Sequence, residues 1–220
     1  MLTVPASKIS GLWYHGDSAK RESFDDQKMD RDRGTQDLNA CGPGIYLTRD
    51  EDQGWGYAWP SGWFSVLRIR PGARVLNEKA PPQKSILLRM IDLAPPENRF
   101  IGLTNYLFEE DTPRARSAVA DEYVRSNNTL LEALVSLYHD VYGHKANLWA
   151  AAMVEAGFDA TLHRLRETEH LVVYNGKIIV RVSEEPYRAE RPEVVPKPLA
   201  RTKSRRQGHG HVMMLKAGRG

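Results

Sequence analysis

A block of helical sequence separates two groups of strand-like segments, and this order constrains the fold more than any other feature of the chain. The strand-like segments are short apolar or aromatic runs bounded by turn residues, and they occupy residues 12–16, 44–48, 62–70, 159–163 and 170–174. The block covers about residues 82–156. It contains a first-turn proline at Pro113 and a capping box from Thr129 to Glu132, and a capping glycine, Gly157, follows it. We therefore predict one α+β domain over residues 1–187 with a helical insertion at about 82–156.

A turn is predicted where the last strand-like run ends. Asn175 and Gly176 follow the run at 170–174 and precede a further strand-like run, residues 177–182, which is apolar except for Lys177 and Arg181. Asn-Gly between two such runs is a strong signal for a two-residue hairpin loop. We therefore expect the last two strands to pair with each other.

Composition narrows the class of protein. The 220 residues fit one domain with an insertion and a tail. The single cysteine, Cys41, excludes an internal disulfide, and no zinc-ligand pattern is present, so we expect a reducing compartment and no metal. No apolar run is long enough to span a bilayer, and the N-terminus does not resemble a signal peptide. We expect a cytoplasmic protein without a membrane partner.

Residues 188–220 differ in composition from the rest of the chain. They contain nine Lys or Arg and two Glu, a net charge of +7, whereas the whole chain carries +3. Residues 1–187 are therefore net negative, at −4. Spaced prolines and the basic run predict a disordered tail. Such a tail can contact nucleic acid or an acidic partner, or it can be a solubilising end.

Two short motifs contain the candidate site residues. His15 and Gly16 end the first strand-like run, where a histidine ring can face a cleft and a glycine leaves its main-chain N–H and C=O accessible. Tyr46 lies in the second run, after a glycine-rich turn, and Tyr57 follows eleven residues later. Two aromatic faces can hold a planar ring between them. The alternative is that these tyrosines pack on the core and the His-Gly pair is a turn.

In this order and spacing, the motifs resemble the NAD-binding half of ADP-ribosyltransferases of the diphtheria-toxin and poly(ADP-ribose) polymerase type. The resemblance implies split antiparallel β-sheets around an NAD cleft. It also implies roles for four residues. The main chain of Gly16 would hold the nicotinamide carboxamide, His15 would bond the ribose on the adenine side, and Tyr46 and Tyr57 would enclose the nicotinamide ring.

The same family has a catalytic glutamate at the start of a late strand. The run from Glu169 through Tyr174 resembles that strand, but aligning its apolar residues puts the glutamate position on His170. Side chains alternate between the faces of a strand, so Glu169 would then face the other way. Three alternatives stay open. A bulge brings Glu169, or less readily Glu167, into the site; His170 bonds the ribose hydroxyl instead; or neither residue acts.

The resemblance implies an NAD-dependent glycosyltransferase with Tyr46, Glu169 and His170 as catalytic candidates. We expect a mono-ADP-ribosyltransferase that uses NAD as co-substrate and transfers ADP-ribose to a macromolecular acceptor, most naturally a protein. A toxin or a phage-encoded modifier acting in the host cytoplasm fits this description. The alternatives are an NAD glycohydrolase, a catalytically silent module that binds NAD or ADP-ribose, and a transferase directed at nucleic acid.

Overall fold

The computed structural model describes residues 1–24, 42–104, 106, 108–165 and 167–188. Within these residues, seven strands form one open sheet in the order β4-β5-β6-β2-β1-β3-β7, and all neighbours are antiparallel except β4 and β5. This mixed architecture confirms the α+β prediction. The strands are β1 (Trp13–Asp17), β2 (Ile45–Thr48), β3 (Trp63–Ile69), β4 (Val75–Asn77), β5 (Ala160–Leu165), β6 (Thr168–Val173) and β7 (Ile179–Pro186).

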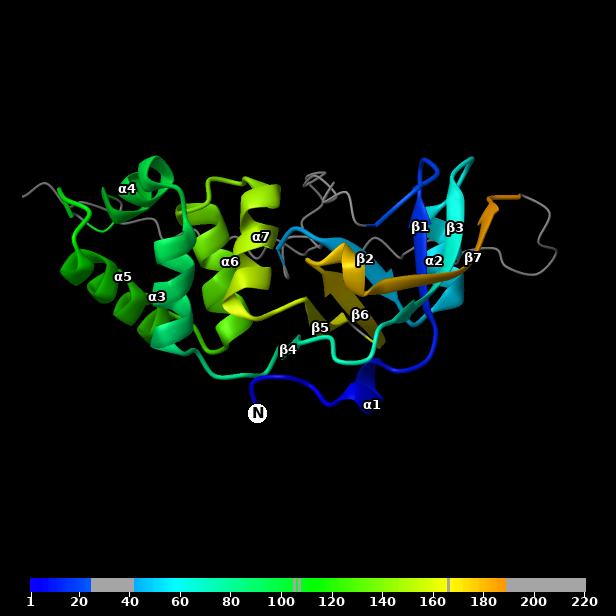
Figure 1. The fold of residues 1–220 in the computed structure, drawn as a ribbon, viewed down its shortest axis with the longest axis horizontal. Coiled ribbons are helices and arrows are strands. Elements are labelled where there is room, and N and C mark those ends of the chain that lie inside the picture. Colours follow the sequence, from blue (N-terminus) through cyan, green and yellow to red (C-terminus); the bar gives the residue numbers. More distant parts are fainter. Residues whose placement is uncertain (25–41, 105, 107, 166, 189–220) are drawn as a thin grey trace, which may run out of the picture.

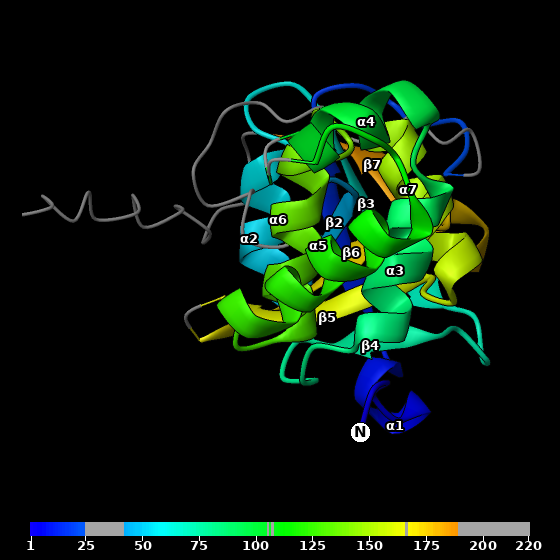
Figure 2. The same ribbon diagram turned by 90° about the vertical axis from the view of Figure 1, so that its left-hand side faces the viewer.

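Five helices between β4 and β5 gather at one side of the sheet, near β4–β6, and α2 lies against β1 and β3 (Figure 1). A view from the helical side shows the five helices in front of the sheet (Figure 2). No described helix is long and apolar enough to cross a membrane. The helices are α1 (Ala6–Ile9), α2 (Glu51–Tyr57), α3 (Lys84–Leu93), α4 (Pro96–Thr104), α5 (Pro113–Ser126), α6 (Leu130–Asp140) and α7 (Ala146–Ala156).

Local sequence signals fix the ends of these helices. Pro113 opens α5, and the capping box of α6 is complete because Thr129 and Glu132 each bond the other's main chain. Gly157 ends α7 with φ 108°, a conformation that favours glycine. The start of α5 at Pro113, the start of α6 at its capping box and the end of α7 at Gly157 are thus as predicted.

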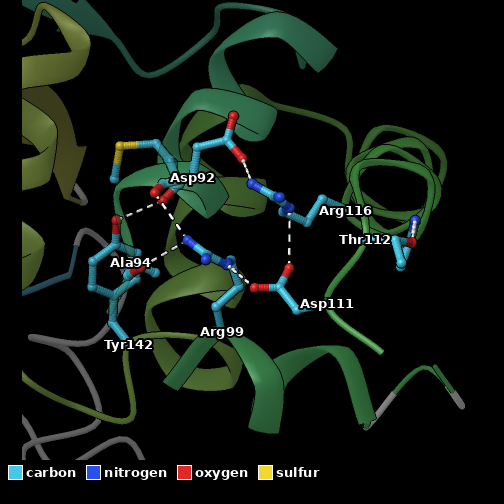
Figure 3. Close-up of polar contacts among 9 residues, drawn as sticks. Asp92, Ala94, Arg99, Asp111, Thr112, Arg116 and Tyr142 are labelled. Carbon is cyan, nitrogen blue, oxygen red and sulfur yellow. Dashed lines mark hydrogen bonds and ion pairs between the residues drawn. The ribbon is translucent and has the colours of Figure 1, made fainter. Parts of the chain in front are cut away.

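A charged network joins α3, α4 and α5 (Figure 3). The Arg99 Nε donates to Asp111 at 2.6 Å, and Arg116 contacts Asp92 at 2.6 Å and Asp111 at 3.0 Å. Arg99 also donates to the main-chain oxygens of Asp92 and Ala94. The guanidinium groups of Arg99 and Arg116 therefore each connect two elements of the structure. Arginine is well suited to these two positions, because its planar group satisfies several acceptors at once.

The sheet is joined most weakly between β1 and β2. These strands share a single residue pair, Tyr14 with Thr48. By contrast, β1 pairs with β3 along its whole length, and β2 does so with β6. The sheet therefore consists of two well-paired groups, β4-β5-β6-β2 and β1-β3-β7, which separate beyond Tyr14.

The predicted hairpin at Asn175 is wrong. A 3-10 turn occupies Gly176–Ile178, and β7 then pairs with β3 at the far edge of the sheet instead of with β6. The Asn175 side chain accepts from the Lys177 N–H and donates to Asp159 at 2.8 Å. Asp159 lies immediately before β5, so this tertiary contact overrides the local turn preference. The predicted basic tail lies outside the described residues, apart from Arg188.

Candidate functional site

His15 and Tyr46 meet where β1 and β2 separate. The His15 Nδ1 lies 2.9 Å from the main-chain oxygen of Tyr46. A carbonyl oxygen only accepts, so Nδ1 carries a proton, and in the neutral ring Nε2 is an acceptor. Nε2 is buried without a hydrogen-bond partner, 3.8 Å from an oxygen of Asp17. The ring thus replaces a main-chain ladder bond between the two strands.

Gly16 lies directly beneath α2. The Asp50 side chain caps this helix by accepting from the Gln53 N–H. A Cβ added at Gly16 would lie 2.3 Å from the Gly54 oxygen and 2.5 Å from the Ala58 nitrogen. No larger residue fits there, so the close approach of helix and strand requires glycine. It also brings the last residue of α2, Tyr57, beside Gly16.

The tyrosines differ in exposure. Tyr46 is half-buried, and its hydroxyl donates to the Gly42 oxygen at 2.6 Å. The side chain of Tyr57 is 51% exposed. Strand alternation puts Tyr46 and Gly16 on the sheet face that α2 covers and His15 on the other face. The structure therefore brings all four predicted NAD-binding residues to the end of β1, on two faces of the sheet.

Glu169 is not brought to Tyr46. It pairs with Arg164 in β5, and no register shift interrupts β6, so its side chain faces away from Tyr46. Its carboxylate lies 3.9 Å from the Arg49 Nε. The bulge alternative is thus contradicted. Glu167 is almost fully exposed in the turn that precedes β6.

His170 lies on the same face as Tyr46, opposite Thr48 of β2. It is 4% exposed, and its Nε2 makes no hydrogen bond. Burial and the neighbouring His163 lower the pKa of His170, and Asp50 offsets only part of that effect. The ring is therefore neutral at physiological pH and supplies no charge to a ligand.

Sequence reasoning missed a charged cluster on the His15 face. Arg21 donates to Asp17 at 2.7 Å, and Arg181 of β7 contacts Glu184 at 3.3 Å. The ring of Phe24 lies among them. Asp17 follows His15 by two residues, so strand alternation alone would have placed it on this face. Arg181 and Glu184 could be found only from the pairing of β7 with β3.

The Asp17 carboxyl is held ionised. Burial raises its pKa, but the His15 ring, when it is protonated, and the Arg21 guanidinium outweigh burial and hold the pKa of Asp17 well below its usual range. Asp17 is therefore a fixed negative charge beside His15, on the same strand as Gly16.

Two cavities lie elsewhere. One, of about 270 Å³, lies at the ends of β4 and β5 and is lined by Glu78, His163 and Glu169 among others. The second, of about 290 Å³, lies between α7 and residues 174–177. Neither is lined by the four predicted NAD-binding residues. In the described part of the chain, no group of three or more His, Cys, Asp or Glu residues is arranged to hold a metal ion.

No protein-family model and no curated protein sequence matches the chain. Among solved structures, the crystal structure of an anti-CRISPR protein is similar to it with a TM-score of 0.34 and 12% sequence identity. The match covers 79% of this chain and 96% of that one. Similarity at this level supports no conclusion about fold or function.

Proposed function

We propose that the protein is a mono-ADP-ribosyltransferase and that NAD binds at the end of β1, where β1 and β2 separate. One observation carries the proposal. The residues that the sequence motifs select, His15 with Gly16, Tyr46, and Tyr57, all lie at the end of β1, where His15 is on one face of the sheet and the other three are on the opposite face. The two strand groups joined by a single residue pair are compatible with the split sheets of the ADP-ribosyltransferase fold.

In the proposed site, the main chain of Gly16 holds the carboxamide, and the rings of Tyr46 and Tyr57 enclose the nicotinamide. His15 accepts from a ribose hydroxyl through Nε2. The bond between ribose C1′ and the nicotinamide nitrogen breaks, and neutral nicotinamide leaves with the bonding pair. A lone pair of the acceptor then bonds to C1′, and the proton of the acceptor passes to solvent. The site holds NAD and the acceptor in the orientation that the reaction needs, and this positioning supplies much of the rate acceleration.

The absence of a β6 carboxylate from the Tyr46 face limits this chemistry. Glu169 pairs with Arg49 on the other face, and buried His170 is neutral. The oxocarbenium-like transition state thus lacks the electrostatic stabilisation that an adjacent carboxylate gives. We therefore propose attachment of single ADP-ribose units to a macromolecular acceptor, a protein before a nucleic acid, in a bacterial cytoplasm. Glutamate-dependent chain elongation is not part of this proposal.

The same observation favours a second candidate, a module that binds NAD without cleaving it. The two functions, and the NAD glycohydrolase, differ in the products they give from adenine-labelled NAD. The protein is incubated with labelled NAD and a bacterial lysate, and label on a denaturing gel is compared with released nicotinamide. A labelled band indicates the transferase, nicotinamide without a band indicates the glycohydrolase, and NAD binding without either product indicates the silent module.

Two exposed aromatic residues provide matched variants. Tyr57 and Trp59 are 51% and 65% exposed, so replacing either with alanine leaves the core intact. Tyr57→Ala should remove nicotinamide release because one wall of the ring site is lost, whereas Trp59→Ala should keep it. Equal activities of the two variants would refute the site assignment. Tyr46→Ala tests the opposite wall, and Tyr46→Phe, which keeps the ring and loses the hydroxyl that donates to Gly42, should stay active.

A further inference from the structure

Phe24 fills the space in front of His15. The two rings meet edge to face with centroids 5.8 Å apart. The guanidinium groups of Arg21 and Arg181 lie 5.8 Å and 5.2 Å from the centre of the Phe24 ring. Phe24 is only 6% exposed. A planar ring is thus held among one imidazole and two cations.

The residues around the Phe24 ring contain buried polar atoms with which a phenyl group cannot form hydrogen bonds. His15 Nε2 and Arg181 Nε are buried without a hydrogen-bond partner. Glu184 Oε1 is also buried without a hydrogen bond, its contact with Arg181 at 3.3 Å being an ion pair. Buried polar atoms without a hydrogen bond are rare in folded proteins, so three in one cluster are a mismatch, although His15 Nε2 and Glu184 Oε1 each have an ion-pair contact, with Asp17 and Arg181. The edge of a phenyl group offers neither a donor nor an acceptor.

We propose that Phe24 is a removable plug and that this receptor, formed by His15, Arg181 and Glu184, takes the heteroaromatic ring of a nucleotide. A ring with adjacent N–H donor and acceptor atoms, such as adenine, would donate to Glu184 Oε1 and accept from Arg181 Nε. The attached ribose hydroxyl would donate to His15 Nε2. In the described conformation, Phe24 then occupies the place of the nucleotide ring and prevents the nucleotide from binding. The choice of adenine rests on the proposed function.

The segment that carries the plug can leave without disturbing the sheet. Residues 18–24 follow the end of β1 and contain neither helix nor strand. Side chains tie them down: Arg21 bonds Asp17, Lys20 lies 4.0 Å from Glu184, and Arg181 donates to the Arg21 oxygen. Polar side-chain contacts of this kind can be replaced by contacts with a ligand or with water. A β-strand, by contrast, could move away only by breaking its main-chain hydrogen bonds to the neighbouring strand.

The test measures AMP binding by isothermal titration calorimetry. AMP contains the adenine and the ribose but no nicotinamide, so no cleavage is involved. A plug that is closed most of the time lowers the apparent affinity by the open fraction. Phe24→Ala should therefore bind AMP at least about tenfold more tightly than the parent protein. Adding Glu184→Leu, which removes the acceptor, should remove much of that gain. Phe100→Ala, at a phenylalanine 44% exposed on α4, is the control and should bind like the parent.

A folded Phe24→Ala variant with the parent's affinity, or with no detectable AMP binding, would overturn the proposal. If the alanine variant does not fold, Phe24→Leu replaces it, because leucine keeps an apolar side chain in the core. Phe24→Leu should also bind AMP more tightly than the parent protein. An unchanged affinity for AMP would again refute the plug. In the parent protein, saturating AMP should speed hydrogen exchange in residues 18–24. Slower or unchanged exchange there would contradict displacement of Phe24.

Failure of this inference is distinguishable from failure of the proposed function. Tyr57→Ala should leave AMP binding unchanged while it removes nicotinamide release, because Tyr57 belongs to the other end of the ligand. If NAD is cleaved but Phe24→Ala gains no affinity for AMP, the plug is refuted and the transferase stands. If the variant binds AMP tightly and NAD is never cleaved, the receptor stands and the transferase is refuted.

Discussion

Two glycines of α2 offer a direct measure of how closely this helix packs on β1. A Cβ added at Gly54 would lie 2.6 Å from the Tyr14 Cβ and 3.3 Å from the Phe64 ring, whereas a Cβ at Gly56 would meet nothing within 4 Å. Replacing glycine with alanine within a helix stabilises it by about 1 kcal/mol. Gly56→Ala should gain that amount. Gly54→Ala should gain the same amount and lose about 1–3 kcal/mol by overpacking.

The helix-propensity contribution cancels when the two variants are compared. Their difference in unfolding free energy therefore reports the overpacking alone, about 1–3 kcal/mol. Urea denaturation followed by circular dichroism measures it, provided that both variants have the same slope. Equal midpoints for Gly54→Ala and Gly56→Ala would mean that α2 does not lie against Tyr14. The placement of Tyr57 beside Gly16, and with it the candidate site, would then be refuted.

Three further predictions concern carboxylates. Asp159→Asn should cost about 1–3 kcal/mol of unfolding free energy, because the buried carboxylate accepts three hydrogen bonds from Arg74; chemical denaturation would show whether the loss is smaller. Asp17 has a folded-state pKa below its unfolded value of about 3.9, so its contribution to the unfolding free energy is present above that pH and is lost as the pH falls further; Asp17→Asn should therefore be less stable than the parent at neutral pH, the difference should shrink in acid, and a difference that does not change with pH would contradict this. Glu169→Gln should release nicotinamide at the parent's rate, since Glu169 faces Arg49. A tenfold lower rate of nicotinamide release would mean that Glu169 does take part in the reaction.

The sequence was most informative where structure depends on near neighbours. Thr129, Pro113 and Gly157 act on the main chain within one helical turn, so the ends of α5, α6 and α7 could be predicted from residue type and spacing. Strand alternation likewise gave the opposite facings of Glu169 and His170, which the register of β6 confirms.

Long-range pairing could not be predicted in the same way. Asn175 has the local chemistry of a hairpin, but its side chain is held by Asp159, sixteen residues earlier, and the chain continues to β3. The charged cluster around Phe24 depends on that pairing, since β7 supplies Arg181. Motifs selected the candidate site residues. The position of Phe24 against the His15 ring could not be predicted, because the residues next to Phe24 in sequence do not indicate which side chains surround its ring.

The position of β7 also affects how the protein is made. Helices α3–α7 contact one another within a short stretch of chain and can fold as they leave the ribosome, whereas β3 waits for the last described strand before its outer edge is paired. Pulse-labelled hydrogen exchange during refolding should protect α5 and α6 before β3. Until β7 arrives, the aromatic and apolar strand Trp63–Ile69 is an open edge to which other chains can add. We therefore expect aggregation of the incomplete chain to begin at this strand.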